Sequence, residues 1–120
     1  MRHRVRKHLK FSNKSFQHRK TMERNLLTSF FLHKSIKTTE KKAKLISPMI
    51  DKLINIVNTK DEMNAIRAVM AVLFTKEASR ELFNNVAPQY KGEKTSGFTR
   101  TTAIKQRDWD NAKIVLIELV

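Results

Sequence analysis

Most of the positive charge of this chain lies in its first third, and this uneven distribution limits where a compact domain can form. Residues 1–44 contain 14 of the 25 Lys and Arg residues but only two acids, Glu23 and Glu40, which gives a net charge of +12. Residues 45–120 contain the other 11 cations and nine acids, and their net charge is +2. A basic arm followed by a nearly neutral body is typical of a folded domain with a nucleic-acid-binding tail.

The length of 120 residues suits one domain of ordinary size. Hydrophobic residues make up 40% of the chain and charged residues 30%, which is enough to build a modest core. Residues 1–14 contain no acid, little apolar periodicity and a turn signal at residues 12–13. We therefore expect a basic RNA-binding arm over residues 1–14 and a single α+β globular domain over residues 15–120.

Apolar residues at helical spacing predict two helices in the first half of this domain. The second of them covers about residues 40–58 with Thr39 as its N-cap, and Pro48 predicts either a kink or a restart capped by Ser47. Between the two helices, residues 33–39 are rich in β-formers and predict a short edge strand. The first helix begins near Ser15, and its buried stripe comprises Met22, Leu26, Leu27, Phe30 and Phe31.

The second half of the domain predicts two more helices and two strands. Thr59 and Glu62 have the spacing of a capping box, which predicts a helix over about residues 60–73. Thr75 is the predicted N-cap of a helix over about residues 76–87, which Pro88 ends. The inward positions of these helices are Ile66, Val69, Met70 and Leu73 in the first and Ala78, Leu82, Phe83 and Val86 in the second.

The end of the chain predicts a hairpin. Residues 98–105 and 112–120 are β-prone and flank a turn. Alternation along the last strand places Val115, Ile117 and Leu119 toward the helices, because Glu118 on the opposite face is costly to bury. The predicted fold is α+β, with four helices packed on a small three-stranded mixed sheet.

Patterns that support catalysis or cofactor binding are scarce. The chain has only two glycines, too few for a phosphate-binding loop, and it has no G-x-S-x-G nucleophile turn. His3, His8 and His18 belong to a basic segment that repels metal cations. Asp108 and Asp110 suit the local capping of a turn. We therefore expect no enzymatic activity, no metal, no cofactor and no small-molecule substrate.

The sequence also lacks features that would place the chain in a membrane. No run of about 18 apolar residues is present, so we expect no membrane insertion. The first ten residues, MRHRVRKHLK, lack the apolar segment of a secretory signal, although an Arg-rich and acid-free start also fits an organellar transit peptide. The absence of cysteine is compatible with the cytoplasm, where we expect the protein in preference to an organelle.

Nucleic acid is the partner that the charge distribution favours. Eight Lys and Arg residues fall among the first twenty, interleaved with aromatic side chains; cations neutralise phosphates, and planar side chains can stack on unpaired bases. Phe11 and Phe16 fit either base stacking or anchoring in the core. Further basic clusters span residues 34–44 and the predicted hairpin. The predicted RNA-binding residues are Arg2, His3, Arg4, Arg6, Lys7, His8, Lys10, Lys14, His18, Arg19, Lys20, Arg24, Lys37, Lys41, Lys42, Lys44 and Arg100.

Two other kinds of protein share a high positive charge. A DNA-binding protein of the nucleoid or of transcription would use a helix-turn-helix with polar, base-reading residues, and residues 60–73 offer only Asn64 and Arg67. A membrane-surface or antimicrobial helix would need a broad apolar face opposite its cations, which the arm lacks. The DNA-binding protein is therefore the principal alternative.

Several short motifs occur in a fixed order along the chain. They are MRHR at residues 1–4, HR at 18–19, RN at 24–25, IKTT at 36–39, KAK at 42–44, LF at 82–83, Pro88, GFTR at 97–100 and the ending DNAKIVLIELV. This ordered set resembles the bacterial large-subunit ribosomal protein seventeen family. The chain departs from the usual pattern at Pro48, at Ser96 and at Lys113, where a proline is usual.

The resemblance implies an α+β domain with a three-stranded mixed sheet, in agreement with the residue pattern. It also implies a structural constituent of the large ribosomal subunit that binds large-subunit (23S-type) rRNA near the peptide exit tunnel. Neighbouring large-subunit ribosomal proteins are the further partners that it implies.

Overall fold

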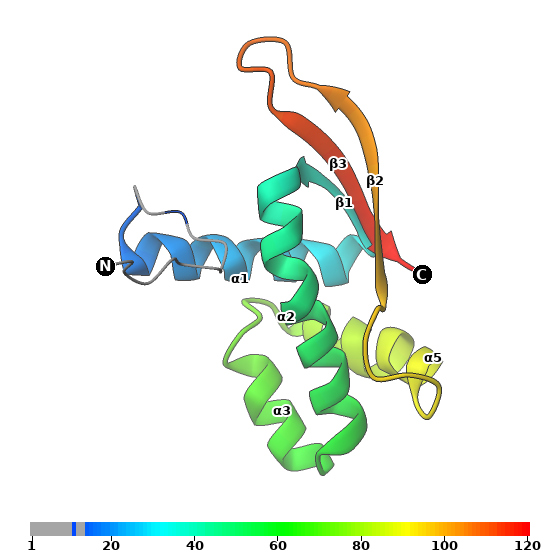
Figure 1. Cartoon of the computed structure of the whole chain (residues 1–120). Coiled ribbons are helices and arrows are strands. Elements are labelled where there is room, and N and C mark those ends of the chain that lie inside the picture. Colours follow the sequence, from blue (N-terminus) through cyan, green and yellow to red (C-terminus); the bar gives the residue numbers. More distant parts are fainter. Residues whose placement is uncertain (1–10, 12–13) are drawn as a thin grey trace, which may run out of the picture.

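The computed structural model describes residue 11 and residues 14–120, so most of the predicted basic arm lies outside the described residues. The α+β class predicted from the sequence is confirmed. Along the chain the elements are α1 (Phe16–His33), β1 (Ser35–Thr39), α2 (Glu40–Thr59), α3 (Glu62–Met70), α4 (Lys76–Glu81), η1 (Leu82–Val86), α5 (Ala87–Tyr90), β2 (Thr99–Gln106) and β3 (Lys113–Leu119) (Figure 1).

Helix α1 begins where the sequence predicts, and its predicted stripe points into the core. The hydroxyl of Ser15 accepts a hydrogen bond from the backbone N–H of His18 (3.2 Å), which caps the helix. Leu27, Phe30 and Phe31 are fully buried. Met22 and Leu26, the two earlier residues of this stripe, are only half-buried, because the first turns of α1 extend past the rest of the molecule (Figure 1).

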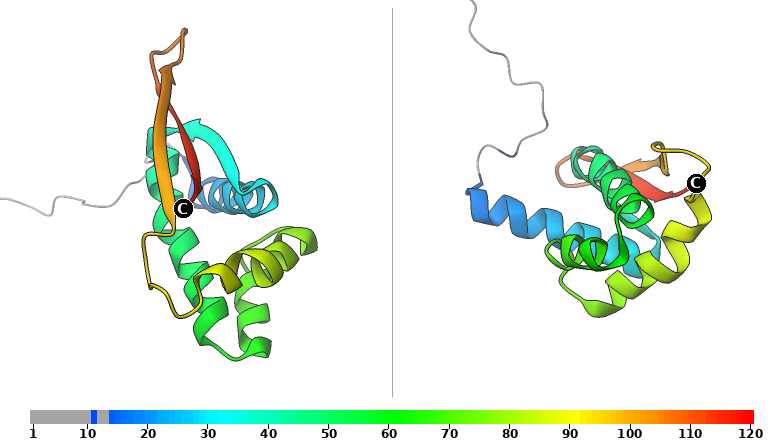
Figure 2. Two further views of the ribbon diagram at one scale, coloured as in Figure 1. Left: turned by 90° about the vertical axis from the view of Figure 1, so that its right-hand side faces the viewer. Right: turned by 90° about the horizontal axis from the view of Figure 1, so that it is seen from below.

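Helix α2 is the central helix and contacts α1, α3, α5 and all three strands (Figures 1 and 2). It runs unbroken through Pro48, so the predicted restart at Ser47 is wrong. Pro48 has no N–H to donate to the Lys44 carbonyl, so one helical hydrogen bond is missing there. Pro48 and Lys44 are both exposed, so water can replace that bond. The hydroxyl of Ser47 instead bonds the hydroxyl of Thr99 in β2 (2.8 Å). The buried residues of α2 are Ala43, Ile46, Ile50, Leu53 and Ile54.

Helix α3 is shorter than predicted and turns a different face to the core. Its N-cap is Asp61, because Thr59 still belongs to α2, where its hydroxyl donates to the Asn55 carbonyl (2.6 Å). The predicted capping box is therefore wrong. So is the inward placement of Ile66 and Met70, which are 38% and 50% exposed.

Packing on two sides explains the face that α3 buries. The helix contacts α2 and α4, and it buries Ala65 and Val69 between them. Leu73, which follows the helix, is buried as predicted. Ile66 and Met70 are left beside a groove of about 600 Å³ between α3 and α4, whose apolar lining also includes Phe74 and Phe83.

The fourth predicted helix is present, but it does not end at Pro88. The hydroxyl of Thr75 caps it by accepting from the Ala78 N–H (3.3 Å). Helix α4 then passes through the π-helical turn η1 directly into α5, which ends at Tyr90. Pro88 is the second residue of α5, which follows the π-helical turn directly. The wider π turn thus lets the helical segment continue through a residue that normally stops it.

The sheet has the order β1-β3-β2, and both pairings are antiparallel rather than mixed. The prediction of β1 as an edge strand is confirmed. Strands β1 and β2 both run antiparallel to β3 and therefore parallel to each other, and helices connect them along the chain. However, β3 inserts between them and pairs with both, so no parallel pair forms among the described strands.

The predicted register of β3 is confirmed. Val115 and Ile117 are 2% and 0% exposed, and Leu119 packs against the same core. Ile114, Leu116 and Glu118 alternate with them and are half-buried on the other face of the sheet. One face of the sheet is therefore closed by the helices, and the other is partly open.

Side chains from α2 and α5 hold the ends of the hairpin in place. The Asp51 carboxylate accepts hydrogen bonds from the N–H groups of Gly97 and Phe98 (3.2 and 3.3 Å) just before β2. The Tyr90 hydroxyl donates to the Val120 carbonyl (2.7 Å) just after β3. Burial of the phenol, and secondarily the nearby acid at position 93, raises the pKa of Tyr90 above its usual value.

Candidate nucleic-acid interface

Several of the predicted RNA-binding lysines lie close together around the start of α2. Lys37 lies in β1, and Lys41 and Lys42 lie in the first turn of α2. Within residue 11 and residues 14–120, none of these three forms an ion pair with a carboxylate. Their charges are therefore not compensated locally, which suits them to bind phosphates.

The end of the basic arm lies against this same part of α2. The ammonium of Lys41 lies 4.5 Å from the centre of the Phe11 ring, and the Lys14 N–H bonds the Phe11 carbonyl (3.1 Å). Phe11 is half-buried, whereas Phe16 is 61% exposed, so the core-anchoring alternative is wrong for Phe16. Phe11, within the predicted arm, therefore lies next to the first turn of α2. The predicted site residues Arg2, His3, Arg4, Arg6, Lys7, His8 and Lys10 lie outside the described residues.

The predicted site residues just before α1 and in its first turns have different surroundings. Lys14 and His18 are exposed, and Arg19 is half-buried. Lys20 is exposed and pairs with Glu23 (3.6 Å). Lys14 is the last residue of the arm and the other three lie in the first turns of α1, so the basic surface continues from the arm onto the helix.

Arg24 also forms internal contacts. Its Nε donates to the Val72 carbonyl (2.8 Å), and its guanidinium lies 4.0 Å from the centre of the Phe74 ring. These contacts tie α1 to the segment between α3 and α4. RNA contact by Arg24 stays a prediction, and the structure gives this residue a structural role as well.

The open face of the sheet carries further cations. Arg100 faces Glu118 across β2 and β3 and pairs with it (2.8 Å), while its side chain stays 63% exposed. Lys37 and Thr102 lie on either side of Leu116 in the same register. Lysine and threonine side chains thus border the half-buried Leu116, and this face presents hydroxyls and positive charge together.

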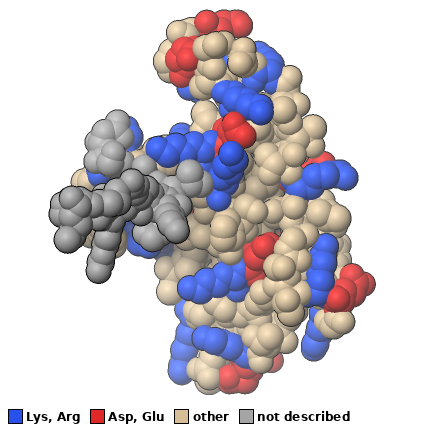
Figure 3. Space-filling model, viewed as in Figure 1, with Lys and Arg blue, Asp and Glu red and all other residues tan. Residues whose placement is uncertain are grey.

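Two lysines share one acid near the start of α2. The Glu40 carboxylate lies 3.2 Å from the ammonium of Lys44 and 3.9 Å from that of Lys113 in β3. Both lysines remain largely exposed, so a surface pair of this kind contributes little to stability. Figure 3, viewed as Figure 1, shows Lys and Arg side chains spread over the face of the molecule that it draws.

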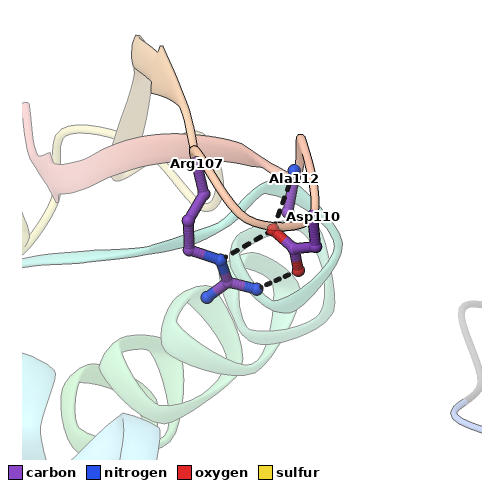
Figure 4. Close-up of polar contacts among 3 residues, drawn as sticks. All are labelled: Arg107, Asp110 and Ala112. Carbon is purple, nitrogen blue, oxygen red and sulfur yellow. Dashed lines mark hydrogen bonds and ion pairs between the residues drawn. The ribbon is translucent and has the colours of Figure 1, made fainter.

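The turn between β2 and β3 is closed by a network that the sequence predicts only in part. Nε and one terminal nitrogen of Arg107 donate to the two oxygens of Asp110 (2.9 and 2.6 Å), and Asp110 also accepts from the Ala112 N–H (3.2 Å) (Figure 4). The hydrogen bond from Arg107 lowers the pKa of Asp110. The predicted local capping role is confirmed for Asp110. Within the described part of the chain, no group of three His, Cys, Asp or Glu side chains could hold a metal ion.

Trp109 in the same turn was not among the predicted site residues. It is 78% exposed, and the Arg107 guanidinium lies 4.4 Å from the centre of its ring. A tryptophan between two aspartates in a predicted turn was the available signal, because so large an apolar side chain is rarely left so exposed.

Comparison with known proteins decides the family. The family model described as ribosomal protein L17 matches residues 22–120. The chain belongs to the ribosomal protein L17 family. The resemblance seen in the sequence motifs is thereby confirmed.

Similar proteins cover nearly the same length. "Large ribosomal subunit protein bL17" of Chloroflexus aurantiacus is 40% identical over 111 residues, which are 92% of this chain and 94% of that protein. The protein of the same name from Clostridium perfringens is 40% identical over 102 residues, or 85% of this chain and 88% of the relative. That of Desulforapulum autotrophicum is 38% identical over 108 residues, or 90% and 88%. The L17 match includes the lysines of β1 and α2 and Arg100, and it starts after the arm and the first turns of α1.

No helix in residues 14–120 combines the length and the apolar character that crossing a membrane requires.

Proposed function

We propose that this chain is a structural, non-catalytic constituent of the large ribosomal subunit and binds large-subunit (23S-type) rRNA. The observation that carries the proposal is the contact between Phe11 and Lys41, because it joins the basic arm to the lysines of α2 in a chain of the L17 family. The names of the relatives, which are large-subunit proteins of bacteria, support the same subunit and a place in the bacterial cytoplasm.

The chemistry of the surface suits a folded RNA. Lysine and arginine neutralise phosphates and displace counterions, and this gives affinity without reading base edges. Lys37, Lys41 and Lys42 supply such charges on the body, and the arm supplies more. Cations in the arm together with the lysines of β1 and α2 suit the irregular backbone of ribosomal RNA better than a uniform duplex.

The finer parts of the proposal concern location and neighbours. The family resemblance implies a position near the peptide exit tunnel and contact with other large-subunit proteins, and we propose both for this chain. The half-buried Ile114 and Leu116 on the open face of the sheet support a neighbour there, because apolar side chains gain stability from additional cover. We expect either rRNA backbone or a neighbouring ribosomal protein to provide it.

Binding to rRNA at a series of salt concentrations tests the proposal. Full-length protein should bind purified large-subunit rRNA more tightly than duplex DNA of equal length at every salt concentration. Replacing Lys37, Lys41 and Lys42 by alanine should reduce the salt slope by about two to three units, at about 0.7–0.9 per phosphate contact.

The matched control replaces by alanine three exposed lysines that belong neither to β1 nor to the first turn of α2, namely Lys60, Lys76 and Lys91. Its slope should change less than that of the first variant. Equal losses in the two variants would show that only net charge matters. Preference for duplex DNA would instead support the DNA-binding alternative.

A further inference from the structure

The turn between β2 and β3 presents one aromatic side chain to solvent. Trp109 is the only tryptophan of the chain, and 78% of its surface is exposed. The hairpin extends away from the helices, with this turn at its tip (Figure 1). An indole in this position gains little from the core of the domain and is available for contact with another molecule.

The turn holds this side chain on a fixed base. The Arg107 N–H donates to the Ala112 carbonyl (2.8 Å), and the Asn111 N–H donates to the Arg107 carbonyl (2.8 Å). Asn111 has a positive φ of 59°, as a tight turn requires. Together with the two bonds between Arg107 and Asp110, these contacts close the turn at both its main chain and its side chains (Figure 4).

Arg107 also determines which side of the indole is available. Its guanidinium lies over the ring at 4.4 Å from the centre, while Asp110 fixes and neutralises that guanidinium. With one face of Trp109 against Arg107 and most of the residue exposed, the other face is open. A flat, open aromatic face on a rigid support is suited to stack on another flat ring.

The charges around the turn favour RNA over an apolar protein pocket as the occupant. Lys105 and Lys113 lie at the ends of β2 and β3 that join the turn, close to where phosphates flanking a stacked base would lie. The turn also holds two acids, Asp108, which is exposed, and Asp110, which is paired and so repels phosphate less than a free acid would. The cations Lys105, Arg107 and Lys113 outnumber them. An apolar pocket of a protein would instead have to bury these charged neighbours.

We infer that Trp109 stacks on an unpaired nucleobase of the bound RNA. The hairpin tip is then a second RNA contact, separate from the arm and from the lysines of α2. This inference rests on the proposed function, because it requires that the protein binds rRNA. Stacking on single-stranded or looped bases tolerates any base, so the contact adds affinity rather than sequence recognition.

The fluorescence of the single tryptophan offers a direct test. Full-length protein is titrated with purified large-subunit rRNA and, separately, with a fully paired RNA duplex, while a filter assay measures binding. We expect rRNA to quench the emission of Trp109, because a stacked base shields and quenches an indole. The duplex should bind with little quenching, because it has no unpaired base to offer.

Three substitutions separate stacking from simple apolar contact. Trp109→Ala should weaken rRNA binding by about 5- to 150-fold, the range for one lost base–aromatic stack. Trp109→Phe should retain most of the affinity, whereas Trp109→Leu, apolar but not planar, should resemble Trp109→Ala. All three should fold normally, because the side chain makes no core contact, and thermal unfolding checks this.

The outcomes distinguish the inference from the proposed function. Absence of any rRNA binding by the unmodified protein would overturn the proposed function. Normal rRNA binding with unquenched emission, or with full affinity in Trp109→Ala, would overturn the inference alone. Normal rRNA binding by Trp109→Ala combined with failure to enter the assembled subunit would overturn it in favour of a protein neighbour.

Discussion

At the scale of single residues, Arg24 shows that a cation in a basic segment can belong to the fold. Its Nε bonds the Val72 carbonyl, and its plane covers the Phe74 ring. Close by, the Thr28 hydroxyl accepts from the Phe74 N–H (3.1 Å). These contacts hold the segment between α3 and α4 against α1, and only a planar guanidinium can form the first two together.

Removing this guanidinium should destabilise the domain. We expect Arg24→Met to lower the free energy of unfolding by about 1–3 kcal/mol, since a charge-assisted hydrogen bond and a cation–π contact are lost. Urea denaturation measures the change, with Lys20→Met as the control because Lys20 is exposed. If both variants are equally stable, the internal contacts of Arg24 contribute nothing and its main role is RNA binding.

The phenol of Tyr90 should make stability depend on alkaline pH. Because its pKa is raised in the folded protein, the phenol loses its proton more readily in the unfolded chain. Its contribution is complete below about pH 10, the ordinary value, and declines as the pH rises toward the folded-state pKa.

Tyr90→Phe should remove this part of the pH dependence. It should also lower stability near neutral pH by about 1 kcal/mol, because the Val120 carbonyl loses its donor. Denaturation series of both proteins at increasing alkaline pH give the comparison, in which lysine titration is common to both. Parallel curves for the two proteins above pH 10 would contradict the expectation.

At the scale of elements, β3 is the strand on which the sheet depends. It pairs with both neighbours and buries one of its faces against the helices. Its other face carries Leu116 between Lys37 and Thr102. The two faces should therefore respond differently to loss of an apolar side chain.

Ile117→Ala should destabilise the isolated protein by about 2–5 kcal/mol, because Ile117 is fully buried and its loss leaves a cavity. Leu116→Ala should lower stability less in the isolated protein, where Leu116 is half-buried. When the two variants are compared at equal concentrations of folded protein, Leu116→Ala should reduce incorporation into the large subunit more than Ile117→Ala does. Thermal unfolding and sedimentation with the subunit give these two measurements. A larger stability loss for Leu116→Ala would mean that the open face of the sheet is the better packed one.

The sequence predicts the helices and strands of this fold better than it predicts how they pack against one another. Ser15, Thr75 and the alternation in β3 act through local hydrogen bonds or strand geometry, so their patterns are readable. The exposure of Met70 depends on where α2 and α4 lie, which no local pattern states. The prediction that Pro88 ends the helix is wrong, because the π turn before it is a rare feature that the sequence pattern does not indicate.

The same limit applies to the candidate site. Composition is enough to predict a basic surface, and the lysines of β1 and α2 follow from it. The inward direction of Arg24 and the support of Trp109 by Arg107 depend on contacts made only after folding. An arginine that makes an internal contact and one that faces solvent add the same charge to the composition. A count of charges therefore cannot tell the two apart.

At the scale of the whole molecule, the body and the basic arm are expected to have separable roles. The body has its own core of helices and sheet, to which the arm adds only the contact at Phe11 among the described residues. Charge is concentrated in the arm and at the adjoining start of α2. Folding should therefore depend on the body, and RNA affinity on both.

Deleting residues 1–14 should leave the unfolding transition almost unchanged but strongly weaken rRNA binding. The deletion removes Arg2, Arg4, Arg6, Lys7, Lys10 and Lys14. If each neutralises one phosphate, the salt slope should shrink by about four to five units, at about 0.7–0.9 per contact. Filter binding at several salt concentrations measures the slope, and circular dichroism checks the fold. An unchanged slope would show that the arm is a solvated tail.

The central position of β3 also affects how the protein is made. Strands β1 and β2 pair only through β3, which follows them in the chain, so a nascent chain that has not reached residue 113 cannot form the sheet. Until then, the backbone groups of β1 have no strand partner, and the part of α2 that packs on the sheet is uncovered. Synthesis that stops early should therefore yield an incomplete core, a species that chaperones and proteases can distinguish from the finished protein before it reaches RNA.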